Sequence, residues 1–184
     1  MRLFIALNIS QRSRDLIASK VKLLKKGLNS KLKWIKKENW HLTLKFLGEC
    51  DEEQKEKIIE KLKEIDISPS QEYIQFNAVN AFPNLKEPRV IFLEVDRGKS
   101  FLNETKKIIE KAMAELGFAE DDREFKAHLS LARNKNSASI DFKDKFLANN
   151  FINIYSKLNT ISLYQSKLYS AGPEYIELFS KKLK

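Results

Sequence analysis

The sequence contains little cysteine, glycine or proline. It holds a single cysteine, Cys50, among 184 residues, which excludes an intrachain disulfide and favours a reducing compartment. Five glycines and four prolines are too few for a collagen-like or disordered chain. The apolar opening at residues 3–7 is too short for a signal peptide or a membrane span. We therefore expect a cytoplasmic protein with no membrane association.

Acidic residues are outnumbered by basic ones. The chain has 34 Lys and Arg against 25 Asp and Glu, a formal net charge of +9, which favours polyanionic partners. With 42% hydrophobic residues, a chain of this length can bury a sizeable core. We expect a single domain over residues 1–184 that acts as a monomer.

Histidine is scarce as well, and its two copies occur in matching sequences. His41 opens the tetrapeptide His41-Leu42-Thr43-Leu44, and His128 opens His128-Leu129-Ser130-Leu131. Histidine can give or take a proton near neutral pH without a perturbed pKa. Along a strand, residues i and i+2 point to the same face, so each motif should present an imidazole beside a hydroxyl while its leucines face the core. The pattern indicates a two-histidine acid/base enzyme.

Hydrophobic periodicity and turn residues predict alternating strands and helices with no obvious linker. Asp51 is a typical helix N-cap, and Gly117 a typical helix end. Grouped strands with interspersed helices favour an α+β fold built on antiparallel sheets. The predicted strands are 2–8, 32–35, 40–47, 72–82, 89–95 and 125–132, the helices are 10–28, 51–65, 100–116 and 141–147, and a final hairpin joins 152–168 to 174–179.

Two histidines facing each other suit in-line displacement at phosphorus. A neutral imidazole can take a proton from water while an imidazolium opposite gives one to the leaving oxygen. The hydroxyls of Thr43 and Ser130 can donate hydrogen bonds to phosphoryl oxygens. Arg133 could add bidentate charge, but in a regular strand its parity places it on the leucine face, away from His128. To contribute, it would have to lie beyond the end of the strand.

Two segments carry a resemblance to a known family. The first signature of the 2H phosphoesterases, in the RNA 2′,3′-cyclic phosphodiesterase branch also called 2′-5′ RNA ligases, is similar to Trp40-His41-Leu42-Thr43-Leu44-Lys45-Phe46-Leu47-Gly48. The second signature is similar to Phe125-Lys126-Ala127-His128-Leu129-Ser130-Leu131-Ala132-Arg133. The first seven residues and the segment 163–175 also resemble that branch, so the resemblance spans nearly the whole chain.

The resemblance implies a fold, a reaction and a set of roles. The fold would be bilobal α+β, with two pseudo-symmetric lobes of antiparallel sheet and flanking helices around a central active-site groove. The reaction would be hydrolysis of an RNA 2′,3′-cyclic phosphate end to a 2′-phosphomonoester, together with reversible 2′-5′ ligation, without metal or cofactor. The implied roles are proton donor for His41, proton acceptor for His128, substrate binding for Thr43, Ser130 and Arg133, and packing near the terminal nucleoside for Phe46.

Two positions depart from the family pattern. Ser130 stands where threonine is more usual, and Ala127 stands where proline often precedes the histidine. Serine keeps the hydroxyl but loses the methyl group that restricts χ1, so we expect lower activity and not its loss.

Other interpretations stay open. Within the enzyme class, the substrate could be a small cyclic nucleotide or a related cyclic phosphate. In another class, the chain could be an RNA-binding protein without turnover, although a pure binder needs no matched acid and base. A lysine-rich stretch could guide an RNA backbone or be a solvated surface. Its lysines are Lys20, Lys22, Lys25, Lys26, Lys31, Lys33, Lys36 and Lys37.

Overall fold

The computed structural model describes residues 1–27, 32–68, 73–134, 152–169 and 172–183. The predicted helix at 141–147 and Lys31 lie outside the described residues.

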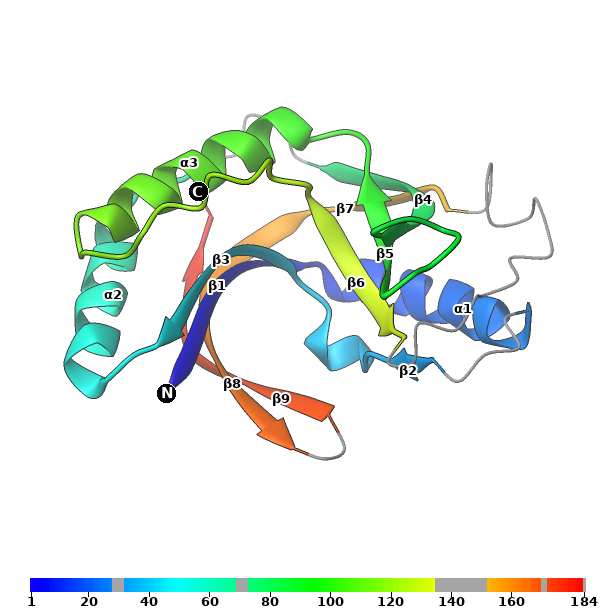
Figure 1. Cartoon of the computed structure of the whole chain (residues 1–184). Helices are drawn as coiled ribbons and strands as arrows, with labels where there is room; N and C mark the ends of the chain where they lie inside the picture. The colour runs from blue at the N-terminus through cyan, green and yellow to red at the C-terminus, as the bar shows by residue number, and fades with distance from the viewer. Residues whose placement is uncertain (28–31, 69–72, 135–151, 170–171, 184) are drawn as a thin grey trace.

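The chain ends and the first histidine motif build one antiparallel sheet, here called sheet A (Figure 1). Its strand order is β3-β1-β8-β9. The apolar residues of β1 are buried on both faces of this sheet, which explains why the strand reads as a continuous hydrophobic run. The strands are β1 (Arg2–Ile9), β3 (Leu42–Glu49), β8 (Leu158–Tyr169) and β9 (Gly172–Lys182).

The second histidine motif lies in a separate antiparallel sheet, sheet B, with strand order β2-β6-β5-β4-β7. The prediction of an α+β fold with antiparallel sheets is confirmed. The strands are β2 (Lys33–Trp34), β4 (Ile74–Phe82), β5 (Val90–Val95), β6 (His128–Arg133) and β7 (Ile154–Ser156).

Three α-helices of the described residues have amphipathic sequences and bury one face each. At the start of α2 the Asp51 carboxylate accepts from the Gln54 backbone N–H, while the Gln54 side chain accepts from the Asp51 N–H, a capping box that explains why the helix begins there. None of the helices in the described residues is long and apolar enough to cross a membrane. The helices are α1 (Gln11–Gly27), α2 (Glu52–Glu64) and α3 (Lys99–Ala114), with a short 3₁₀ turn, η1, at Lys37–Asn39.

The prediction of one long strand over 152–168 was wrong. The segment forms two strands: β7 pairs with β4 in sheet B, and β8 pairs with β1 and β9 in sheet A. Between them, the buried Ser156 hydroxyl accepts from the Ser10 N–H and donates to the Lys157 carbonyl. Burial alternates without interruption from Ile154 to Leu158, so the hydrophobic pattern holds no sign of the change of sheet. The final β8–β9 hairpin is as predicted.

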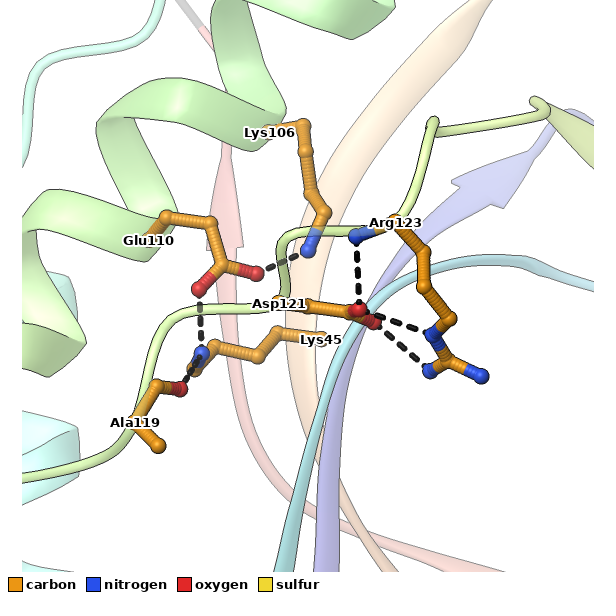
Figure 2. A network of polar contacts seen from close by, with 6 residues as sticks. All are labelled: Lys45, Lys106, Glu110, Ala119, Asp121 and Arg123. Carbon is orange, nitrogen blue, oxygen red and sulfur yellow. Dashed lines mark hydrogen bonds and ion pairs between the residues drawn. The ribbon is translucent and has the colours of Figure 1, made fainter.

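A buried charge network joins the first motif strand to the helix and segment that lead to the second motif. Lys45 of β3 and Lys106 of α3 both form ion pairs with the Glu110 carboxylate, and Lys45 also donates to the Ala119 carbonyl at 2.7 Å (Figure 2). Removing the carboxylate would leave two ammonium groups buried without it, which is strongly unfavourable. The network therefore fixes β3 against α3 and the segment that precedes β6.

Candidate active site

His41 lies one residue before β3 and is oriented by its neighbours in the chain. Its Nε2 is 3.1 Å from the Thr43 hydroxyl oxygen. The backbone of Asn39 favours the protonated form of the ring. Nε2 is thus the nitrogen that the ring presents beside Thr43.

Aromatic rings enclose His41. Phe4, Tyr175 and Tyr164 have ring centroids 4.9, 5.3 and 5.8 Å from the imidazole centroid. Burial lowers the pKa of His41 to about 4, against the favourable effect of the Asn39 backbone. The positive charges of Arg14 and of a protonated His128 lower it further. The imidazole is therefore neutral at pH 7 in the free protein.

His128, the first residue of β6, has a fixed tautomer. Its Nδ1 lies 2.6 Å from the Lys126 carbonyl oxygen. Since a carbonyl can only accept, Nδ1 carries the proton and Nε2 keeps its lone pair. Phe82 and Phe92 pack edge-on against the ring, with centroids at 5.0 and 5.1 Å. Burial lowers the pKa of His128, and the charge of Arg133 adds to this effect. A neutral imidazole with a free Nε2 is suited to act as a base.

Arg133 shares a face of sheet B with His128 because of a β-bulge. Against β5, Ser130 is paired with Phe92 and Ala132 with Ile91, so Leu131 is one residue extra. An extra residue reverses the inward and outward alternation beyond it. Arg133 therefore lies on the histidine face, and the expectation that parity excludes it within the strand was wrong.

The two motifs come together across the two sheets. Arg133 of sheet B lies close enough to Tyr175 of β9 in sheet A to lower the pKa of its hydroxyl, against the effect of burial, and the Tyr175 ring packs edge-on against His41. Strands β3 and β6 also contact each other. The charge of His128 reaches His41, as its effect on the pKa of His41 shows. Histidines 87 positions apart in the sequence thus belong to one candidate site.

The remaining predicted residues fall on the same two faces. Thr43 is in contact with His41, and Ser130 is two residues from His128 on the same side of β6. Phe46 is 70% exposed, and its ring centroid lies 6.0 Å from that of Phe4. A second shift in pairing, at Leu44, places Phe46 on the Thr43 side of β3 and turns Lys45 to the other face. Phe46 is thus an exposed aromatic ring at the edge of the His41 surroundings.

Sequence reasoning missed the residues that surround His41. Phe4, Tyr164 and Tyr175 come from three strands that the topology brings together, and no role was assigned to them from the sequence, although they lie in the segments 1–7 and 163–175 that resemble the family. Beneath them, the Tyr164 hydroxyl donates to Asn8, whose amide donates to Ser162 at 2.8 Å. The polar residues Asn8 and Ser162 on otherwise apolar strands were a further signal in the sequence. This network supports the tyrosine that packs against His41.

The lysines of the lysine-rich stretch lie in different environments. Lys25 lies over the Trp34 ring, and Lys37 forms an ion pair with Asp15 at 3.4 Å. Lys33 is paired with Arg133 in the β2–β6 ladder, so it lies beside the candidate site. Among the described residues, no group of three or more His, Cys, Asp or Glu side chains could hold a metal ion.

Comparison with known proteins identifies the family. The family model described as LigT-like phosphoesterase matches residues 10–92. An RNA 2′,3′-cyclic phosphodiesterase of Archaeoglobus fulgidus is 36% identical over 182 residues, which cover 97% of this chain and 98% of the relative. The RNA 2′,3′-cyclic phosphodiesterase of Methanocaldococcus jannaschii is 36% identical, over 95% of this chain and 96% of the relative. The chain belongs to the LigT-like phosphoesterase family.

Solved structures share the fold of this chain. A protein of Thermus thermophilus superposes with a TM-score of 0.79 at 24% identity, covering 100% of this chain and 98% of its own. E. coli LigT complexed with 3′-AMP gives a TM-score of 0.74 at 20% identity, with 99% and 97% covered. The family model ends before His128, but the full-length relatives span both motifs.

Proposed function

We propose that this LigT-like phosphoesterase hydrolyses the 2′,3′-cyclic phosphate at RNA ends to a 2′-phosphomonoester, with reversible 2′-5′ ligation as a side reaction. The relatives that match nearly the whole chain bear the name RNA 2′,3′-cyclic phosphodiesterase, and the E. coli neighbour binds 3′-AMP. The net charge of +9 suits a polyanionic substrate.

One observation carries the chemistry of this proposal. Nδ1 of His128 lies 2.6 Å from the Lys126 carbonyl oxygen, which leaves Nε2 free, and His41 presents Nε2 beside the Thr43 hydroxyl. The two rings lie on sheets that meet where Arg133 is close to Tyr175. Two imidazoles that each present Nε2 can handle the attacking and the leaving oxygen of one phosphorus.

The proposed reaction is an in-line displacement. Water attacks phosphorus while Nε2 of His128 takes its proton. The bond from phosphorus to O3′ breaks, and Nε2 of protonated His41 gives its proton to O3′. Because the pKa of His41 is about 4 in the free protein, the acid must be charged by the substrate: a phosphodiester anion beside the ring favours the imidazolium.

The neighbouring side chains have corresponding roles in the proposal. The hydroxyls of Thr43 and Ser130 donate to phosphoryl oxygens, and Arg133 supplies positive charge. Thr43 already contacts Nε2 of His41, so it also orients the acid. Phe46, exposed beside Phe4, packs against the terminal nucleoside.

The test is incubation of purified protein with an RNA oligonucleotide that ends in a 2′,3′-cyclic phosphate, in the presence of EDTA. We expect a 2′-phosphate product, identified by chromatography against 2′- and 3′-phosphate standards. The variants His41→Ala and His128→Ala, purified in parallel, control for a contaminating ribonuclease. A 3′-phosphate product would contradict the proposed bond cleavage, and no turnover by folded protein from roughly pH 5 to 9 would leave the RNA-binding alternative. Faster turnover of a cyclic mononucleotide would favour the small-substrate alternative.

A further inference from the structure

A cavity of about 840 Å³ opens beside His128 and is used by no step of the hydrolysis. Its volume lies within the range of about 300–1,000 Å³ typical of small-molecule sites. Its walls come from β4 and β5, the loop between them, the start of α3 and the segment 124–127. All of its lining residues belong to the described part of the chain.

The cavity floor continues the catalytic face of sheet B. Glu94 is paired with His128, Phe92 with Ser130 and Asn80 with Phe92, so these side chains share one face of three adjacent strands. Phe82 and Phe92 line the cavity and also pack against the His128 ring. The cavity and the imidazole therefore share a wall.

In-line geometry decides which part of a substrate can lie there. In the proposed reaction the leaving O3′ faces His41, and the attacking oxygen faces His128. The terminal ribose carries O3′, so it lies on the sheet A side, near Phe46. Whatever carries the attacking oxygen lies on the sheet B side, where the cavity is. Water needs no such space, but a larger hydroxyl compound does.

The lining suits a nucleoside. The rings of Phe82, Phe92 and Phe125 offer apolar surface against which a base can pack. The amide of Asn103 offers a hydrogen-bond donor and acceptor, whereas that of Asn80 is already bonded to Glu94 and to the Ala81 N–H. Lys86 and Lys126 line the cavity and suit the phosphate that follows the nucleoside in an RNA chain, while Lys99 forms an ion pair with Glu94 at 3.9 Å. Glu94 and Glu124 also line the cavity and can accept from the amino groups of a base.

We propose that this cavity binds the first nucleoside of an RNA that ends in a free 5′-hydroxyl, the acceptor in 2′-5′ ligation. The inference rests on the proposed function and adds the acceptor site to it. The 5′-oxygen attacks phosphorus of the cyclic phosphate and its proton passes to Nε2 of His128. The bond from phosphorus to O3′ breaks and O3′ takes the proton of His41. The products are a 2′-5′ phosphodiester and a free 3′-hydroxyl, with no other reactant.

The test compares two acceptors with one donor. An RNA ending in a cyclic phosphate is mixed with a 5′-hydroxyl RNA dinucleotide or with ethanol at the same concentration, and the ratio of transfer product to hydrolysis product is measured. A bound acceptor places its hydroxyl at phosphorus, so we expect the dinucleotide to give a ratio at least about tenfold higher than ethanol. Equal ratios would overturn the proposal while leaving the hydrolysis intact.

Matched variants locate the effect. Asn103→Trp fills the cavity from an exposed position on α3, and Lys107→Trp makes the same change on an exposed position of α3 that does not line it. We expect Asn103→Trp to abolish the dinucleotide advantage with an unchanged hydrolysis rate, and Lys107→Trp to keep both. An advantage that survives Asn103→Trp would refute the site.

A binding measurement separates this proposal from the proposed function. If the wild type hydrolyses nothing, the proposed function fails, and calorimetric titration with the 5′-hydroxyl dinucleotide still tests the cavity. Binding that Asn103→Trp weakens at least about tenfold and Lys107→Trp does not would support the nucleoside site. No binding, or equal binding by all three proteins, would overturn it.

Discussion

His41 and His128 share a backbone arrangement but not an environment. His41 sits among three aromatic rings from β1, β8 and β9, and its pKa falls to about 4. His128 packs against two phenylalanines of one hairpin beside an open cavity, and its pKa is lowered less. The proposed acid is thus the histidine that holds its proton less well in the free protein.

This difference indicates that the roles are assigned by the substrate more than by the free protein. An imidazole with a low pKa is a strong acid once a phosphate anion has charged it, because burial still disfavours the imidazolium. His128 needs no such event, since its neutral form with a free Nε2 is already a base. Changes at the two histidines and their neighbours should therefore have effects of different size.

Replacing the histidines should have the largest effect. We expect His41→Ala and His128→Ala each to lower kcat by about 10²- to 10⁴-fold, the usual contribution of a positioned acid or base. The double variant should be little worse than the poorer single one, because the two act on one transition state. Steady-state kinetics on an RNA cyclic phosphate measure all three. Fully multiplicative losses would mean that the histidines act in separate steps.

The two hydroxyls come next. Thr43→Val and Ser130→Ala should each slow turnover by about 10- to 1,000-fold, as for other donors to a developing charge. The loss should be greater for Thr43→Val, because Thr43 also contacts Nε2 of His41. Ser130→Thr is the matched control and should retain activity. Wild-type rates in both Thr43→Val and Ser130→Ala would mean that these two residues have only a structural role.

The pH profile should show how the substrate changes His41. To react, the free protein must have His41 protonated and His128 neutral. The pKa of His41 is about 4, and that of His128 lies below its usual 6.5. The value of kcat/KM should therefore peak below pH 6.5 and fall about tenfold per pH unit above it. The kcat profile should extend to higher pH, because bound phosphate raises the pKa of His41. Identical profiles for the two constants would refute charging by the substrate.

The difference between the two histidines should also affect the stability of the fold, and this is the smallest expected effect. At pH 7.5 His41 is largely neutral in both folded and unfolded chains. As the pH falls toward 4, the unfolded chain binds a proton that the folded chain does not, so the free energy of unfolding drops by roughly 3 kcal/mol. Urea denaturation at pH 7.5 and 4.5 should show a smaller drop in His41→Asn than in His128→Asn. The reverse order would contradict the greater desolvation of His41.

Local pattern predicted most of the fold. Period-2 and helical spacing gave the strands β1, β3, β4 and β5 and the three helices, because burial of one face determines those residues. It failed where strand pairing changes without a mark in the hydrophobic pattern: at the change of sheet after Ser156 and at the bulge at Leu131. A bulge leaves no mark in the hydrophobic pattern when the extra residue is itself apolar.

The candidate site was predicted in its motifs and missed in its surroundings. His41, Thr43, His128 and Ser130 follow from two short sequences, and the structure brings them together. The aromatic rings around His41 depend on the order of strands in sheet A, which is set by long-range pairing that no local spacing encodes. Sequence therefore gives the reactive groups, and topology gives the environment that sets their proton affinities.

The nearness of Arg133 and Tyr175 has a consequence for the free protein. The Arg133 guanidinium lies beside a neutral phenol and opposes the burial that raises the pKa of Tyr175. In the proposed reaction, an incoming phosphate gives this cation a stronger, charged acceptor in place of the phenol oxygen. Tyr175 is then the group from which the proposed substrate draws Arg133 away.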